Sequence, residues 1–154
     1  MKKYPILIGT AMAVSSLFFI GCGNEQKPIP EAAPAAETAE AAPDPMLDKG
    51  IGPITAINLG EVDKTLAEKG KVTFESKCVA CHKIDAKLLG PALAGVANRR
   101  SPEWIMNMIL NPEEMTKNNE IAKQLLKDHG NVQMTNQQLS QDQAREVLEF
   151  LRTI

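Results

Sequence analysis

Hydrophobic residues recur at helical spacing through the second half of the chain. The first run has four positions, each four residues after the last: Val62, Leu66, Gly70 and Phe74. Residues at i and i+4 share one face of a helix. Asp63 supplies an N-cap side chain at the start of this run, so the pattern predicts a helix that ends near Lys77.

Two further helices are expected between residues 101 and 128. Ser101 and Pro102 are a typical start signal, with serine as the N-cap and proline at the first helical position. The buried side of this helix is predicted to contain Trp104, Ile105, Met108 and Ile109. Asn111 ends the helix and, with Glu114, has the pattern of a capping box for the next turn. The second helix is predicted from about Glu120 to Lys127, with Ile121, Leu125 and Leu126 facing inward.

The C-terminal segment predicts one more helix. Residues 129–139 are polar and are expected to be non-helical. Ser140 and Gln143 then form a capping box. Five hydrophobic residues follow at helical spacing: Ala144, Val147, Leu148, Leu151 and Ile154. The chain is therefore predicted to fold as an all-α domain with about four to five helices, preceded by a non-periodic lead-in at residues 51–60.

The amino terminus has a different character. Lys2 and Lys3 precede an apolar run, residues 6–20, that is shorter than the ~20 residues of a transmembrane helix. This arrangement predicts a secretory signal over residues 1–21. Because Cys22 follows the apolar run directly, the site resembles the lipobox of bacterial lipoproteins, which implies an acylated cysteine. An uncleaved anchor and a simple secretory cut are the alternatives.

Residues 22–52 are rich in Ala, Pro and Glu and poor in larger apolar residues. Such a segment cannot bury enough surface to offset its ordering entropy, so we expect a disordered tether. The domain is then predicted to span residues 53–154.

Charge is unevenly distributed along a chain whose net charge is −2. Residues 64–100 hold eight basic and three acidic residues, whereas residues 101–154 hold five basic and eight acidic residues. The first segment is therefore a basic collar. A solvated face is one interpretation, and docking to an acidic redox partner is the other.

The chemistry of the chain centres on Cys78-Val79-Ala80-Cys81-His82. A Cys-x-x-Cys-His run is typical of covalent c-type haem attachment. Three alternatives are weaker. A thioredoxin-like pair needs a neighbouring βαβ pattern, and the chain, with three Cys and two His, offers only a poorly spaced zinc set that would include His129. A disulfide between the two cysteines would close a very small loop.

At these residues the chain resembles a class I monohaem cytochrome c. The resemblance covers about residues 60–154 and implies the cytochrome c fold, with the helices around one covalent haem c and its iron. It implies thioether bonds from Cys78 and Cys81 and iron ligation by His82. It also implies that the Pro91 carbonyl accepts the Nδ1–H of His82, and that Leu93 packs on the porphyrin.

The resemblance extends to the packing of the first helix and to the haem edge. Gly70 and Phe74 match the residues that pack on the last helix in this family. The positions of Arg99, Arg100 and Trp104 imply a role in binding the haem propionates.

A methionine from a loop before the last helix is the sixth ligand in this family, and Met134 matches by position. Thioether ligation favours ferrous iron and raises the potential. The competing ligands are His129 and three other methionines: Met106, Met108 and Met115.

The resemblance implies a one-electron carrier rather than an enzyme. We expect it to act between a membrane donor and an extracytoplasmic oxidoreductase, held to a bacterial membrane by its lipid and facing the periplasm. We expect no nucleic-acid partner and no small-molecule substrate. The alternatives are a haem sensor or peroxidase-like enzyme with an open sixth position, and a fixed cytochrome subunit of a larger redox complex.

Overall fold

The computed structural model describes residues 44–154; the expected signal, Cys22 and most of the expected tether lie outside them. The described chain is helical and contains no strand. Its elements in order are α1 (Lys64–Lys77), the 3-10 helix η1 (Val96–Asn98), α2 (Pro102–Leu110), α3 (Pro112–Asn118), α4 (Glu120–Asp128) and α5 (Gln141–Leu151). Within residues 44–154 no helix has the length and hydrophobicity to cross a membrane. The expected all-α class and helix count are confirmed.

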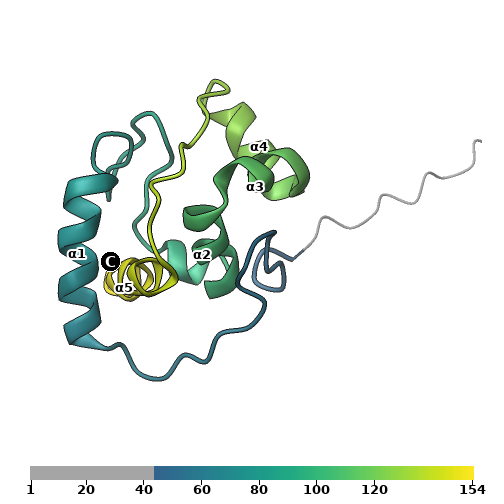
Figure 1. Cartoon of the computed structure of the whole chain (residues 1–154). Coiled ribbons are helices and arrows are strands. Elements are labelled where there is room, and N and C mark those ends of the chain that lie inside the picture. The colour runs from purple at the N-terminus through teal and green to yellow at the C-terminus, as the bar shows by residue number, and fades with distance from the viewer. Residues whose placement is uncertain (1–43) are drawn as a thin grey trace, which may run out of the picture. The chain divides into compact units, whose positions relative to one another are not determined.

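Helices α1 and α5 cross closely (Figure 1), and Gly70 lies at the crossing. A Cβ atom built on Gly70 would lie 1.9 Å from the carbonyl oxygen of Glu146 in α5, which leaves room only for glycine. One turn later, the rings of Phe74 and Phe150 meet with their centroids 5.2 Å apart. Such a tilted aromatic pair adds to the stability from burial. The contact expected between the first and last helices is therefore confirmed.

The start of each principal helix is fixed by a side-chain cap. The Asp63 carboxylate accepts hydrogen bonds from the amides of Thr65 and Leu66, and the Ser101 hydroxyl accepts one from Trp104. Ser140 and Gln143 form the predicted capping box of α5. These caps satisfy amide groups that would otherwise lack partners in the first turn.

The capping box expected at Asn111 does not form. Asn111 precedes α3, but its side chain makes no capping hydrogen bond there. Its amide instead donates to the carbonyl of Ile51, 3.2 Å away. The prediction was wrong because a contact with a segment distant in sequence takes the side chain that the local pattern assigned to the helix.

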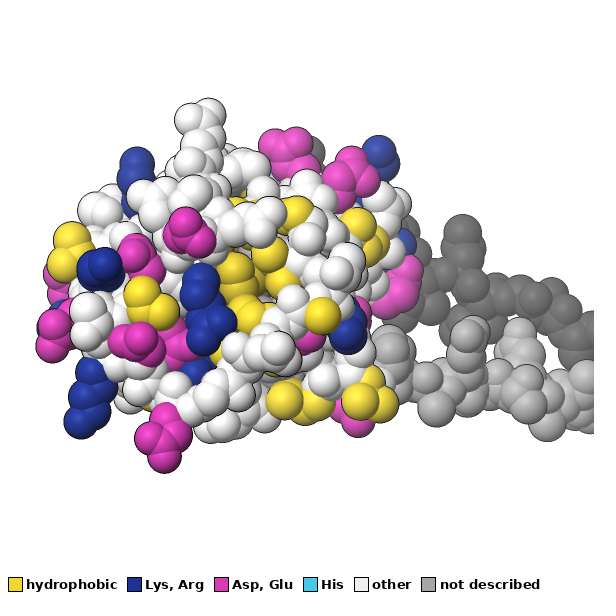
Figure 2. Space-filling view, turned by 60° about the horizontal axis from the view of Figure 1, so that its bottom comes forward, with side chains coloured by type: hydrophobic (Ala, Val, Ile, Leu, Met, Phe, Trp, Pro, Cys, Tyr) yellow, Lys and Arg dark blue, Asp and Glu magenta, His cyan; other side chains and the backbone are white. Residues whose placement is uncertain are grey.

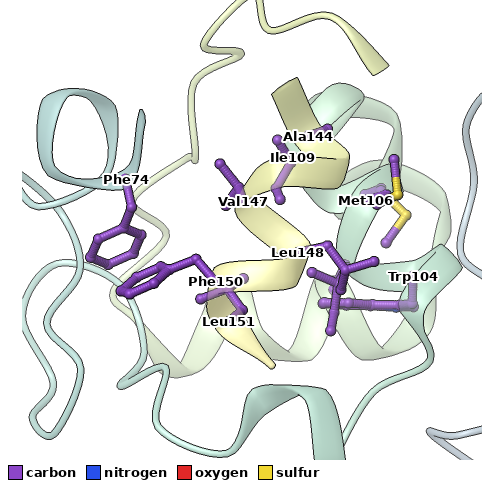
Figure 3. Close-up of a cluster of buried hydrophobic side chains, with 12 residues drawn as sticks. Phe74, Trp104, Met106, Ile109, Ala144, Val147, Leu148, Phe150 and Leu151 are labelled. Atoms are coloured by element: carbon purple, nitrogen blue, oxygen red, sulfur yellow. The ribbon is translucent and has the colours of Figure 1, made fainter. Parts of the chain in front are cut away.

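The hydrophobic core lies where α5 packs on α2 and α1 (Figure 3). Val147, Leu148 and Leu151 of α5 are buried, and they face side chains of α2 that include Trp104 and Met106. The predicted hydrophobic face of α5 is confirmed from Ala144 to Leu151. Met108, expected in the buried stripe of α2, is only half-buried.

A buried carboxylate, that of Glu149, joins α5 to the start of α1. It is completely inaccessible to solvent. It pairs with Arg145 and Arg152 at N···O distances of 2.6 and 2.8 Å, and it accepts the amide of Asp63 at 3.2 Å. A buried charge is tolerated when it is paired and hydrogen-bonded in this way.

Residues 48–57 form a strap that lies along α2. The side chain of Asn107, 1% exposed, donates to the carbonyls of Lys49 and Ile54 and accepts the amide of Ile54, each within 3.0 Å. Glycine is required at Gly52, where a Cβ atom would lie 2.4 Å from the Asn107 amide oxygen. The sequence assigns residues 48–52 to the tether, whereas in the structure they contact the domain.

Candidate functional site

One apolar cavity of about 310 Å³ collects the predicted haem-site residues. Eight of them line it: Cys78, Cys81, His82, Pro91, Leu93, Arg99, Trp104 and Met134. They come from the segment after α1, from the segment that leads into α2, from α2 itself, and from residues 129–139, which run between α4 and α5 (Figure 1). Residues far apart in sequence therefore meet around one space, as expected for a bound haem. Cys22 lies outside the described residues.

The His82 imidazole is held in one orientation. Its Nδ1 lies 3.0 Å from the carbonyl oxygen of Pro91, which can only accept a hydrogen bond, so Nδ1 carries the proton. The other ring nitrogen, Nε2, is then the basic one and is available to a metal. The hydrogen bond that the sequence predicts between these two residues is present.

Glycine at position 90 completes this support. A Cβ atom on Gly90 would lie 2.4 Å from Cε1 of His82, and the Gly90 amide donates to the carbonyl of Cys81 at 2.8 Å. The backbone thus packs directly against the ring. A preorganised imidazole beside an apolar cavity fits an iron porphyrin well.

The two cysteines lie in one helical turn that also carries the histidine. The amides of Cys81 and His82 donate to the carbonyl of Cys78 at 3.1 and 2.9 Å. Burial, with a smaller contribution from Cys81, raises the pKa of the Cys78 thiol to about 11. Both thiols are free. The described chain contains no group of three or more His, Cys, Asp or Glu side chains arranged to hold a metal ion.

Met134 is held at the cavity by polar contacts on both sides. The side-chain amide of Gln133 donates to the Met134 carbonyl at 3.0 Å, and its oxygen lies 2.9 Å from the hydroxyl of Thr116 in α3. Asn136 donates to the carbonyl of Leu110 at 2.9 Å. These bonds tie the segment around Met134 to α2 and α3. Thr116 and Gln133 were not predicted, because nothing in the local sequence distinguishes them from other polar residues.

The competing ligands divide into two groups. Met106 and Met115 are buried outside the cavity, and the sulfur of Met115 accepts the amide of Ile51 at 2.9 Å. Met108 and His129 do line the cavity. The Nδ1 atom of His129 is buried and has no hydrogen-bond partner within the described chain. The lining of the cavity therefore leaves Met134, Met108 and His129 as candidates for the sixth iron ligand.

The expected propionate-binding group is only partly supported. The indole N–H is the only polar group of Trp104, and it donates to the side-chain oxygen of Asn119 at 3.1 Å. The indole N–H therefore already has a partner within the protein, and the role of Trp104 at the propionates stays a prediction. Arg99 donates to the carbonyls of Ala92 and Ala94 and retains further N–H groups.

Arg100 also lines the cavity, with its guanidinium 5.3 Å from the centre of the Trp104 ring. Burial is the main cause that lowers the pKa of Arg100, followed by the charge of Arg99, while Asp48 acts in the opposite direction. An arginine in such a site stays protonated. It places a positive charge beside the cavity.

Comparison with known proteins identifies this arrangement. A family model described as "Cytochrome c" matches residues 67–154. Cytochrome c-551 of Stutzerimonas stutzeri is 49% identical over 37 residues, which are 23% of this chain and 36% of that protein. A cytochrome c-553-like protein of Synechocystis sp. is 34% identical over 62 residues, 32% of this chain and 59% of that protein. The chain thus matches less than two thirds of the length of either relative.

A solved structure, cytochrome c from Rhodothermus marinus, superposes with a TM-score of 0.64 at 44% identity. The superposition covers 66% of this chain and 88% of that chain.

Proposed function

The chain belongs to the cytochrome c family, and from this premise we propose that it is a one-electron carrier whose haem iron is held by His82 and Met134. The family implies one covalent haem c, with its iron, at Cys78 and Cys81. When bound, this group supplies a metal centre that accepts and donates single electrons.

One observation carries the proposed ligation. His82 and Met134 lie in segments separated by three helices, yet both line the same cavity. The Pro91 carbonyl leaves Nε2 of His82 available to iron, and Gln133 and Asn136 restrain the segment that presents the Met134 sulfur. If His82 and Met134 both held the iron, no open site would remain for a substrate, which would favour electron transfer over catalysis.

The charges around the cavity support a carrier that docks to a redox partner. The residues that line the cavity beside the cysteines include Lys77 and Arg99, which belong to the basic collar at residues 64–100. On the face shown in Figure 2, hydrophobic side chains gather near the middle and charged side chains of both signs surround them. We infer that an acidic redox partner docks near the cavity, because complementary charge accelerates association.

The proposed location follows from the sequence of the amino terminus. Acylation at Cys22 would anchor the protein to a membrane through the tether at residues 22–52, outside the cytoplasm. The donor is then a membrane redox protein and the acceptor an extracytoplasmic oxidoreductase.

The test is the absorption spectrum of both oxidation states in matched variants. The ferric wild type is expected to show the weak far-red band of methionine–iron ligation. Met134→Ala should abolish this band, whereas Met108→Ala, which alters another methionine of the same cavity, should retain it. Loss of the band in Met108→Ala but not in Met134→Ala would show that Met108 is the ligand. Ready binding of carbon monoxide by the ferrous wild type at neutral pH would contradict a carrier with both positions filled.

A further inference from the structure

Asp48, in the strap before the family match, is connected to the wall of the haem cavity. Its carboxylate accepts the side-chain amide of Asn119 at 2.7 Å, and its backbone carbonyl accepts the hydroxyl of Ser101. Asn119 in turn accepts the indole N–H of Trp104 at 3.1 Å and caps α4 through the amide of Ala122. Asp48, which lies outside residues 67–154, is thus linked to the cavity-lining Trp104 through the side chain of Asn119.

The charge of the same carboxylate also acts on Arg100, whose pKa it raises against the opposing effects of burial and Arg99. Trp104, 4% exposed, stacks beneath the Arg100 guanidinium at 5.3 Å and is itself held by Asn119. Arg100 also donates to the carbonyl of Arg99 at 2.7 Å. Asp48 is the acidic group that acts on Arg100, whereas Arg99 and burial act against its charge. Asp48 therefore both fixes the platform on which Arg100 rests and partly balances its charge.

We propose that Asp48 is a positioning residue of the haem pocket, which acts through Arg100 and the Asn119–Trp104 pair to lower the reduction potential of the bound haem. Reduction adds an electron to the site, so a nearby negative charge opposes it and a nearby positive charge favours it. Asp48 supplies the negative charge and partly offsets the positive charge of Arg100. This inference rests on the proposed electron-transfer function only in that haem occupies the cavity, and it holds for any sixth ligand.

The experiment is redox titration of the haem-loaded protein by absorbance at low ionic strength. Asp48→Asn should shift the reduction potential upward. Asp44→Asn is the matched control, because it removes the same charge four residues earlier, at an exposed side chain whose only hydrogen bond within residues 44–154 is to the amide of Met46. The control should shift the potential less. Arg100→Gln should shift it downward.

The combination of variants separates positioning from bare charge. In the Arg100→Gln background, Asp48→Asn should produce a smaller upward shift than in the wild type, because the cation through which it acts is gone. Equal shifts in both backgrounds, equal shifts for Asp48→Asn and Asp44→Asn, or no shift at all would each overturn the proposal.

Two further measurements keep the test decisive. If Asp48→Asn yields no haem-loaded protein, Asp48→Ser takes its place in both backgrounds, and an unchanged or lowered potential refutes the role. Failure of Met134 ligation is read separately, from the far-red band of the unmodified protein. The two outcomes are therefore distinguishable.

Discussion

Replacement of Gly70 by alanine should destabilise the protein even though alanine favours helix formation. Alanine in place of glycine inside a helix contributes about 1 kcal/mol. Against this gain stands the crossing with α5, where the new Cβ would lie 1.9 Å from the Glu146 carbonyl oxygen, 2.4 Å from its carbonyl carbon and 2.9 Å from the Val147 nitrogen. All three are backbone atoms, so no side-chain rotation relieves the contact.

The magnitude follows from the separation that the clash demands. A Cβ···O contact below 3.0 Å is essentially never seen, so the two helices would have to move apart by roughly 1 Å. A gap of this size forfeits about a quarter to a half of each dispersion contact across the interface, including those between Phe74 and Phe150. Overpacking of this kind costs about 1–3 kcal/mol or more. Because the clash is with backbone atoms, we expect a cost of about 3 kcal/mol, which after the gain of about 1 kcal/mol leaves a net loss of about 2 kcal/mol in the free energy of unfolding.

Denaturant unfolding of the haem-loaded protein, followed by far-ultraviolet circular dichroism, measures this loss at an unchanged slope m. Gly60→Ala is the matched control, because no atom lies within 4 Å of the position its Cβ would take. It should change the free energy of unfolding by less than about 0.5 kcal/mol. A Gly70→Ala protein as stable as the wild type would refute the argument, since helix propensity would then outweigh the crossing.

Three other changes test separate parts of the structure. Gly90→Ala should lower the yield of haem-loaded protein and alter its absorption spectrum, because the new Cβ would lie 2.4 Å from Cε1 of His82; an unchanged spectrum at full haem content would show that the ring needs no such support. Glu149→Gln should cost about 2 kcal/mol or more in the free energy of unfolding, below the largest losses for buried pairs because Arg145 and Arg152 remain partly exposed. Glu146→Gln, which breaks only a 4.0 Å pair with Lys69, should cost less than about 1 kcal/mol in the same measurement. Equal losses in the two variants would show that the buried Glu149 ion pairs add no particular stability. Replacement of Lys77 by glutamine should slow electron exchange with an acidic partner at low salt and have little effect at high salt, as measured by stopped-flow absorbance; a salt-independent effect would argue against electrostatic docking.

The sequence predicts the helices well because their signals are local. Asp63, Ser101 and Ser140 each cap the helix that their side chains reach within three residues. The Cys-x-x-Cys-His run and the Gly90-Pro91 pair are local signals in the same sense, and both line one cavity.

Contacts between distant segments were not predictable in this way. Asn111 has a capping pattern but bonds instead to Ile51, and Trp104 has the position of a propionate ligand but donates to Asn119. The sequence shows which side chains can form hydrogen bonds and leaves open which partners compete for them. Residues 48–52 of the strap were assigned to the tether for the same reason, since their contact with α2 depends on Asn107, a polar residue in a mostly apolar helix.

Helix α4 shows why the haem belongs to the fold as well as to the function. Of its nine residues only Ala122 is buried, although Leu125 and Leu126 were expected to face inward. Both leucines line the cavity and are half-buried, and Leu125 also packs against the hydrophobic core. Apolar side chains in this position stabilise the domain only when an apolar group covers them. We propose that the porphyrin is that group, and that its attachment at Cys78 and Cys81 would fix in place the surface on which α4 and the Met134 segment pack. Electron transfer and folding thus depend on the same bound group, which explains why the polypeptide core alone is small for the number of helices it holds together.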